Sequence, residues 1–415
     1  MIRRVGGVAR SRDESAQTVS TLPRFHVARG DLIFGAAVFA AYVTAVALAI
    51  GVDNANPDGM MLVAERALGG RLDSDLLKGS GDIVDVGGRY FLALGPLQLL
   101  PYLPLAAVPA LQGIGRYLVG LLFGLPAAWL ALPLARAFGA RGTDAYWIAA
   151  LTAVGSLLFY VSVLGDMYYL AHAESFLALT VFLLEWAGRR RPVVLGASLA
   201  LSFLARPTTL LAAIPFGLAL LWKERLRLRT VTRSLLAFSL PIAGAIALYG
   251  WFNWVRFGSP LESGYAISYL SEPSLVARRA AGIFSIGQLP ENLRLALLAL
   301  PSSIRFPIFI PSAFGMSMLL VSPALLTAAW AGIRDRMAQV LWLAAVLVAV
   351  PVFLYYGGGY VQYGFRYSLD FTPFLVALIA IGSRKWIGRP ERLLIIASIG
   401  SLCWGVLCGI AWHSA

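Results

Sequence analysis

Apolar runs long enough to cross a membrane recur along almost the whole chain, and they constrain its fold more than any other feature. They lie at about residues 31–51, 95–111, 117–135, 144–164, 172–187, 193–204, 208–222, 234–254, 313–332, 337–356, 371–382 and 393–412. A helix of roughly 20 apolar residues spans the hydrocarbon core of a bilayer. Hydrophobic residues make up 59% of the chain and charged residues only 13%, which is far from the balance of a soluble domain. The pattern predicts an all-α polytopic protein embedded in the lipid bilayer.

The basic residues gather in short segments between the apolar runs. They are the N-terminal arginines, Arg136 with Arg141, Arg189–Arg191, the stretch from Lys223 to Arg233, Arg334 with Arg336, and the stretch from Arg384 to Arg392. The net charge of +13 is therefore better explained by the positive-inside rule than by a nucleic-acid partner. Placing these segments in the cytoplasm predicts that every other loop lies outside. It also predicts that residues 1–30 form a disordered cytoplasmic tail.

The run at 95–111 is the exception to the spanning pattern. Its interior prolines are Pro96, Pro101, Pro104 and Pro109. Each interior proline removes a helical hydrogen bond, and a crossing here would turn two of the basic clusters outward. We therefore interpret it as an interfacial or re-entrant segment of the first external loop. The prediction is a single transmembrane domain over residues 31–412 with about eleven spanning helices, a cytoplasmic N-terminus and an external C-terminus.

Two predicted external loops are long, at 52–116 and about 255–312, and we expect them to form the face that carries the active site. The acidic residues of the first loop are Asp53, Asp58, Glu65, Asp73, Asp75, Asp82 and Asp85, out of 21 in the whole chain. Charge beside a membrane is costly, so acidic groups there usually serve chemistry or ion handling. A solvated loop that happens to be acidic is the plainer alternative.

Asp58 begins a segment with the spacing of an amphipathic helix. The apolar face of that helix consists of Met61, Leu62, Ala64, Leu68 and Leu72. Such a helix is expected to lie on the membrane surface. Asp58 follows Pro57 at the expected helix start, where a carboxylate complements the helix dipole, so one interpretation is a capping residue. The other is a general base that takes the proton from an acceptor hydroxyl.

Several segments, in their order along the chain, resemble the GT-C glycosyltransferases. The first external loop carries N-x-x-x-D-G-x-x-x-x-A-x-x-x-L-x-G-R-L, then G-G-R-Y-F and a proline-rich run. Later segments with the same resemblance are HAESFLALTVFLLEWAGRRRPVVLGASLALSFLARPTTLL, WFNWVRFGSPLESGY, PSAFGMSMLLVSPALL and YGFRYSLDFTPFL. They extend over most of residues 31–382. The resemblance is to bacterial relatives of the family-39, protein mannosyltransferase-like type.

The resemblance implies a membrane enzyme that moves a sugar from a polyprenyl-phosphate donor to an acceptor hydroxyl with inversion at the anomeric carbon. The acceptor would be a glycan, a lipid or a protein at the external face of the cell (inner) membrane. The resemblance also implies an acidic catalytic base in the first external loop, where Asp58 stands at the matching position. Many relatives carry a second acidic residue directly after that aspartate, whereas this chain has Gly59. The assignment therefore stays open, with Asp53 as the reserve candidate.

A second acidic position is implied in the short external loop between the third and fourth predicted helices. That loop reads LGDMYYLAHAES and contains Asp166, His172 and Glu174. These residues are expected to position the acceptor or, as in some relatives, to bind a divalent metal. No tight D-x-D pattern supports a metal, so no cofactor is firmly implied. A lone histidine at a helix mouth is more often an ordinary hydrogen-bonded residue.

A phosphate leaving group needs cations where its charge develops, and arginine suits this role through bidentate contacts. The predicted topology places Arg206 and Arg366 at external helix ends, against the positive-inside trend. Arg366 has Tyr363, Tyr367 and Asp370 beside it. The alternative is an ion pair with an external carboxylate, because Arg366 and Asp370 have i,i+4 spacing.

Three further arginines are weaker candidates for the substrate site. They are Arg89, Arg256 and Arg305. Snorkelling of a long basic side chain to the membrane interface explains them as well as a role in substrate binding does. The cysteines, Cys403 and Cys408, both lie in the last apolar run, and their spacing fits neither a metal motif nor a disulfide framework. We interpret both as packing residues.

Two functions from other classes compete with glycosyl transfer. A transporter or lipid flippase would use the same acidic and basic groups to line a path. Such proteins often show paired halves or helices broken at corresponding positions, and no such internal symmetry is found in the sequence. A non-catalytic scaffold subunit with a degenerate site is the other alternative, and Gly59 keeps it open.

Overall fold

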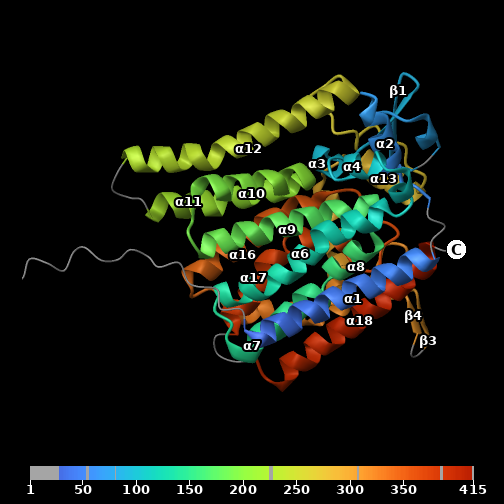
Figure 1. Ribbon diagram of the computed structural model, residues 1–415. Coiled ribbons are helices and arrows are strands. Elements are labelled where there is room, and N and C mark those ends of the chain that lie inside the picture. The colour runs from blue at the N-terminus through green and yellow to red at the C-terminus, as the bar shows by residue number, and fades with distance from the viewer. Residues whose placement is uncertain are drawn as a thin grey trace, which may run out of the picture.

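The computed structural model describes residues 28–52, 56–79, 81–223, 228–305, 308–383 and 387–413. Within these residues, six helices are long and apolar enough to cross a membrane. They are α1 (Arg29–Val52), α6 (Gly115–Ala137), α9 (Met167–Ala187), α12 (Leu228–Phe257), α16 (Arg336–Leu354) and α18 (Arg389–His413). Figure 1 shows them lying side by side along one common direction. The prediction of a helical polytopic membrane protein is confirmed.

The other apolar runs form shorter or broken helices. These are α7 (Gly142–Ala153) with α8 (Leu157–Leu164), α10 (Pro192–Ala205), η2 (Pro207–Ala212) with α11 (Ala213–Lys223), α15 (Met318–Val321) with η4 (Pro323–Ala331), and η5 (Arg366–Asp370) with α17 (Thr372–Gly382). The pair α7 and α8 is bent by 45°, and the Ser156 hydroxyl restarts the helix by accepting from the Leu158 N–H. Each run expected to span thus coincides with one helical element or one consecutive pair. The number that cross the bilayer stays a prediction.

The proline-rich segment at 95–111 does not form one continuous helix. It forms α3 (Pro96–Leu99), α4 (Tyr102–Ala106) and α5 (Pro109–Gln112). Pro96 and Pro109 occupy the first positions of α3 and α5, where the missing N–H breaks no helical hydrogen bond. Together with α2 (Gly59–Leu68), these short helices lie in the first long loop, where the sequence predicted surface or re-entrant helices.

The two ends of the helix bundle differ in character. At one end, Arg136 forms an ion pair of 2.6 Å with Asp31, and the Tyr146 hydroxyl donates to the same carboxylate. Arg392 lies 3.5 Å from Asp144 at this end. At the other end lie α2, β1 (Ile83–Val86) and α13 (Pro273–Ala280), with β3 (Ser303–Arg305) and β4 (Ile308–Ile310) at the same end but lower in the view (Figure 1). This separation of basic segments from long loops agrees with the predicted topology, whose orientation in a membrane stays a prediction.

The long loops contain two small hairpins that the all-α expectation did not include. Strand β1 (Ile83–Val86) pairs with β2 (Arg89–Leu92), and β3 (Ser303–Arg305) pairs with β4 (Ile308–Ile310), both antiparallel. Gly87 and Gly88 have φ of 62° and 84°, as the mirror-image two-residue turns of hairpins require. The first hairpin also joins the second loop, because the Asp82 N–H donates to the Tyr269 oxygen and the Tyr269 N–H to the Ile83 oxygen, each at 2.8 Å.

The second long loop also carries η3 (Ile286–Gln288) and α14 (Leu289–Leu297), and the first carries η1 (Asp75–Leu77). Arg256, at the end of α12, ties the loops to the bundle. Its buried guanidinium donates to the carbonyl oxygens of Leu92 and Leu94 at 2.6 and 3.0 Å and stacks on Phe252. Arg256, a weaker candidate for the substrate site, is therefore a structural link between the loops and the bundle. The side chain of Arg305, another such candidate, lies outside the described residues.

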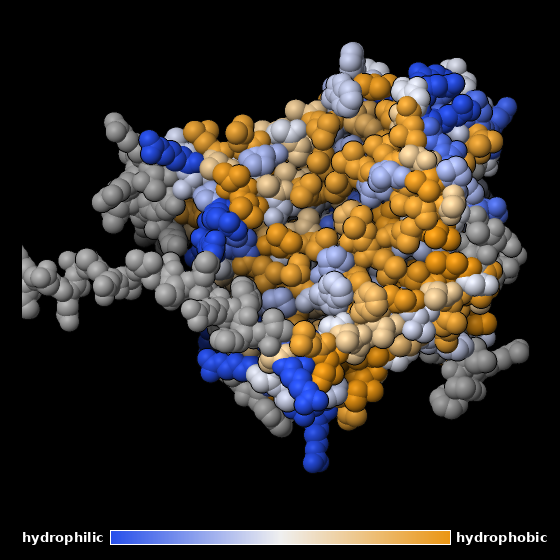
Figure 2. All heavy atoms as spheres, viewed as in Figure 1, coloured by the Kyte–Doolittle hydropathy of each residue, from blue (hydrophilic) through white to orange (hydrophobic). Residues whose placement is uncertain are grey.

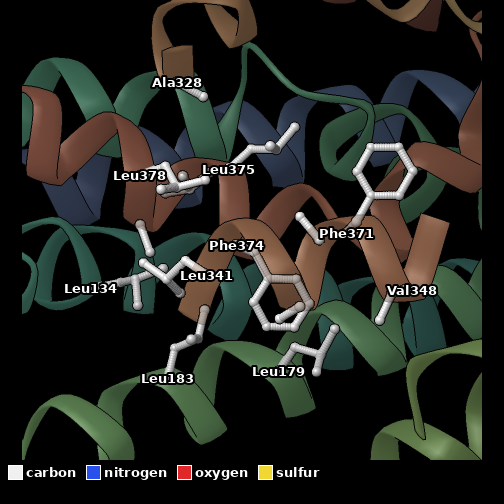
Figure 3. Packing of buried hydrophobic residues seen from close by; sticks show 14 of the residues in the cluster. Leu134, Leu179, Leu183, Ala328, Leu341, Val348, Phe371, Phe374, Leu375 and Leu378 are labelled. Atoms are coloured by element: carbon white, nitrogen blue, oxygen red, sulfur yellow. The ribbon is translucent and has the colours of Figure 1, made fainter. Parts of the chain in front are cut away.

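The core lies where α6, α9, α16 and α17 meet. Leu134, Leu179, Leu341 and Phe374 are completely buried there and point toward one another (Figure 3). The outer surface is apolar as well, and Figure 2 shows hydrophobic side chains across the middle of the visible face. On α12, Leu240 is 74% exposed. Because so large an apolar surface is not stable in water, this face is suited to lipid.

Close packing between α10 and α12 depends on a glycine. A Cβ atom at Gly196 would lie 2.1 Å from the carbonyl oxygen of Phe238 in α12, so a side chain there would force the two backbones apart. Small residues at such crossings let membrane helices approach closely.

We expect Gly196→Val to destabilise the protein by about 1–3 kcal/mol through overpacking. Gly244→Val is the matched control, because Gly244 lies within α12 and a Cβ there would meet no atom within 4 Å. Thermal unfolding in detergent measures both. Equal losses in the two variants would show that the α10–α12 contact is not the cause.

Candidate active site

Asp58 lies at the start of α2 and is held by two hydrogen bonds. The Met61 N–H donates to its Oδ1, and the Tyr102 hydroxyl on α4 donates to its Oδ2, each at 2.8 Å. The first bond is an N-cap, so the capping interpretation is confirmed. The second fixes the direction of the carboxylate from another helix. Capping leaves lone pairs on both oxygens, so it does not preclude acid–base chemistry. The reserve candidate, Asp53, lies outside the described residues.

The surroundings of Asp58 suit a base. Burial raises its pKa to about 6, the hydrogen bonds from Met61 and Tyr102 oppose the rise, and the nearby charge of Asp166 adds to it. Asp166 caps α9, where its Oδ1 accepts from the Tyr168 N–H at 2.8 Å. The starts of α2 and α9 thus bring two predicted acidic residues into electrostatic contact. With a pKa near 6, Asp58 is a carboxylate at neutral pH and a stronger base than an exposed aspartate.

Close packing around position 59 accounts for the glycine there. A Cβ at this position would lie 2.9 Å from the Met167 sulfur and 3.3 Å from a Leu77 methyl carbon. The start of α2 is therefore pressed against the start of α9. A second acidic residue directly after Asp58 would have to displace the ends of the Met167 and Leu77 side chains.

Asp370 is the centre of a buried ionic cluster. The Arg206 guanidinium donates to both of its oxygens, at 3.0 Å from Nε and 2.9 Å from Nη2. The Thr208 hydroxyl donates to Oδ2 at 2.7 Å, and Nδ1 of His172 lies 3.0 Å from Oδ1. Asp370 is completely buried and Arg206 is 17% exposed. His172 and Arg206 therefore meet at one carboxylate.

The expected ion pair between Arg366 and Asp370 is wrong. The five residues from Arg366 to Asp370 form the 3-10 helix η5, in which residues three apart share a face and residues four apart do not. Asp370 instead faces Arg206, 164 positions earlier in the chain.

Arg366 is consequently a buried cation whose direct contacts are all with neutral groups. It is 7% exposed, and its Nη1 donates to the Tyr360 carbonyl oxygen at 3.0 Å and to Oε1 of Gln362 at 3.1 Å. The guanidinium carbon lies 5.3 and 5.1 Å from the ring centres of Tyr169 and Tyr367. Within the described residues, Arg366 forms no ion pair and its Nε donates no hydrogen bond. A buried charge without a counter-ion is costly, and an anionic ligand would remove that cost.

The remaining predicted substrate residues do not contact the Asp370 carboxylate. Arg89 is about half-exposed and forms an ion pair of 2.7 Å with Asp73. The Tyr363 hydroxyl lies 3.1 Å from that of Ser401 on α18. Glu174 is buried on α9, and neither carboxyl oxygen has a hydrogen-bond partner within the described residues. The structure therefore brings Asp58 close to Asp166 and His172 to Arg206, but does not place Arg89 or Tyr363 with them.

An aromatic group beside Arg366 escaped the sequence argument. Rings of Tyr355 and Tyr367 have centres 6.0 Å apart, and those of Tyr355 and Tyr356 lie 4.7 Å apart. Tyr265 also packs on Tyr355, at 6.0 Å. The available signal was the pair of adjacent tyrosines directly after the apolar run of α16. Within the described part of the chain, no group of three histidine, cysteine or acidic residues could hold a metal ion.

No family model matches the chain, and no curated protein matches its sequence. Its fold is similar to a crystal structure of ArnT from Cupriavidus metallidurans bound to undecaprenyl phosphate. The TM-score is 0.50 at 11% identity, over 92% of this chain and 75% of that one. At this identity the similarity shows that the two chains share a fold. The similarity agrees with the expected all-α membrane fold, and membership in the GT-C enzymes and the family-39 type stay predictions.

The two buried arginines should differ in what they contribute to stability. Asp370→Asn leaves the Arg206 charge buried without its counter-ion and should cost about 3–5 kcal/mol. Arg366→Met removes a charge that has no ionic partner, so stability should stay unchanged or rise. Thermal unfolding of the purified variants in detergent measures both. A loss in Arg366→Met as large as that in Asp370→Asn would show that Arg366 is a structural residue.

Proposed function

We propose that this protein is a membrane glycosyltransferase that takes a sugar from a polyprenyl-phosphate donor and transfers it to an acceptor hydroxyl at the external membrane face. The similarity in fold to ArnT, whose crystal structure contains undecaprenyl phosphate, supports a polyprenyl phosphate as the lipid partner. The bilayer would deliver this donor, and the loops 52–116 and 255–312 would enclose the site.

The single observation that carries the proposal is that Arg366 is buried and, within the described residues, forms no ion pair and has a free Nε. In a donor complex, a phosphate oxygen would accept from the free Nε of Arg366 and supply the missing counter-ion. When the bond between the anomeric carbon and phosphate breaks, negative charge grows on the leaving oxygen, and a fixed guanidinium stabilises it. Asp370 already neutralises Arg206, so Arg206 would act mainly by holding Asp370 and His172 in place.

Asp58 is the proposed base. Its carboxylate would take the proton of the acceptor hydroxyl while the acceptor oxygen forms its bond to the anomeric carbon. The sugar–phosphate bond breaks on the opposite side, and its electron pair leaves with the lipid phosphate, which inverts the anomeric configuration. Asp166, electrostatically coupled to Asp58, would help to position the acceptor. The tyrosines around Arg366 would exclude water, whose attack would waste the donor.

A transporter or lipid flippase and a non-catalytic scaffold remain the competing functions. Both could bind a polyprenyl phosphate at Arg366, but neither needs a base with a raised pKa beside a second carboxylate. Chemical turnover therefore separates these functions from the proposed one.

Sugar transfer should be measured in membranes supplied with a panel of polyprenyl-phosphate sugars. We expect wild-type transfer with at least one donor, and losses of about 100-fold or more in Asp58→Asn and Arg366→Met, as for other preorganised catalytic groups. Asp85→Asn and Arg294→Met are the matched controls, since both residues are exposed and serve only local contacts. Donor binding without turnover in the wild type would favour the scaffold or flippase. Full transfer by Asp58→Asn would contradict its role as base.

The pH dependence of transfer should follow the ionisation of Asp58. Because its pKa is raised to about 6, the rate should fall as pH drops below about 6 and the base becomes protonated. The Tyr102 hydrogen bond lowers that pKa, so Tyr102→Phe should move the acid limb to higher pH while leaving activity at high pH largely intact. A pH–rate profile of kcat/KM for both proteins tests this. An acid limb that does not move in Tyr102→Phe would separate the limb from Asp58.

A further inference from the structure

Asp82 has a conformation that its position in the first hairpin does not explain. It directly precedes β1 and has φ of 60°, a left-handed conformation that costs energy in a residue with a Cβ. Its backbone N–H donates to the Tyr269 carbonyl oxygen at 2.8 Å, so the second long loop fixes it there. Strained residues of this kind are concentrated at functional sites.

The Asp82 side chain is half-buried but unused by the fold. Within the described residues its carboxylate accepts no hydrogen bond and forms no ion pair. Asp85 in the same hairpin shows the ordinary behaviour, because its Oδ1 accepts from the Gly88 N–H at 2.8 Å and closes the turn. An aspartate that neither caps a turn nor pairs with a cation has all of its lone pairs available for a ligand.

The groups around Asp82 belong to the proposed donor site. Burial raises the pKa of Asp82, and the positive charges of Arg366 and Arg279 oppose this rise. The Tyr168 hydroxyl donates to the Gly81 carbonyl oxygen at 3.1 Å, which anchors the neighbouring residue to the start of α9. Arg279 is itself fixed by Ser268, whose carbonyl oxygen accepts from it at 2.6 Å.

Two tyrosines of the aromatic group lie within electrostatic range of Asp82. Burial raises the pKa of both Tyr265 and Tyr356, and the charge of Asp82 raises each further. A carboxylate next to aromatic rings is a combination that suits a saccharide. The carboxylate accepts from hydroxyl groups, and the rings pack against the apolar face of the sugar ring.

We propose that Asp82 binds hydroxyl groups of the sugar on the polyprenyl-phosphate donor and so helps to determine which sugar is accepted. The inference rests on the proposed function, in which Arg366 holds the phosphate. The sugar is bonded directly to that phosphate. Gly81, which precedes Asp82, accepts a hydrogen bond from Tyr168, and the ring of the next residue, Tyr169, stacks on Arg366. Asp58 and Asp166 are left for the acceptor.

The test compares binding of two kinds of ligand to the purified full-length protein. The probes are undecaprenyl phosphate alone and undecaprenyl phosphate carrying glucose, mannose, N-acetylglucosamine or a pentose. For the sugar that wild type prefers, we expect Asp82→Asn to weaken binding about 10-fold and Asp82→Gly more, because hydrogen-bonded hydroxyls contribute strongly to selectivity. Binding of undecaprenyl phosphate alone should not change in either variant.

Asp82→Gly guards against a trivial loss of folding. Glycine adopts φ of 60° without strain, so this variant should unfold at the same temperature as wild type or higher while losing its preference for the sugar. Asp85→Asn is the control on the same hairpin and should keep that preference. A sugar preference retained in both Asp82 variants would overturn the inference and leave the proposed function standing. A wild type that binds none of the probes would contradict the proposed function and the inference together.

Discussion

The rest of the site depends on the ion pair between Asp370 and Arg206, which leaves a second buried arginine, Arg366, without an ionic partner among the described residues. Asp370 accepts from Arg206, Thr208 and His172, and it thereby joins the end of α10, the start of η2, helix α9 and η5. Asp370 is occupied by this pairing, so the direct contacts of Arg366 are with carbonyl oxygens, Gln362 and tyrosine rings. A protein that needed Arg366 only for folding could replace it by an apolar side chain at little cost. The charge balance therefore points to an anionic ligand.

The long loops are built as one structure, and this is why the site can be preorganised. Backbone hydrogen bonds join the first hairpin to Tyr269, and Arg256 ties the end of α12 to the strand region at Leu92 and Leu94. Tyr102 reaches from α4 to Asp58 on α2. Each contact links segments that are distant in sequence, so acidic groups from one loop and cations from the other keep fixed positions. Fixed charges cost no reorganisation when a reaction begins.

The helices could be predicted from the sequence, because a run of spanning length such as 117–135 has few alternatives to the helix it forms. Asp58 was predictable as a cap, because it follows a proline and directly precedes residues with helical spacing. The partner of Asp370 was not, since i,i+4 spacing assumes an α-helix and η5 is a 3-10 helix. Arg206 is 164 positions from Asp370, a contact that no periodicity reveals. The hairpin beside Asp82 has strands of only four residues, too short to leave a clear signal.

Gly59 constrains the chemistry that this site can perform. With Met167 and Leu77 packed against it, a second carboxylate at the start of α2 would have to displace both of these side chains. Whatever a second acidic residue contributes there in similar enzymes must come here from elsewhere, and Asp166 at the start of α9 is the carboxylate whose charge reaches Asp58. Two carboxylates on separate helices have separate hydrogen-bond partners, so their pKa values can be set independently. Tyr102, for example, donates to Asp58 and lowers its pKa. Close packing of α2 on α9 is therefore compatible with a working base.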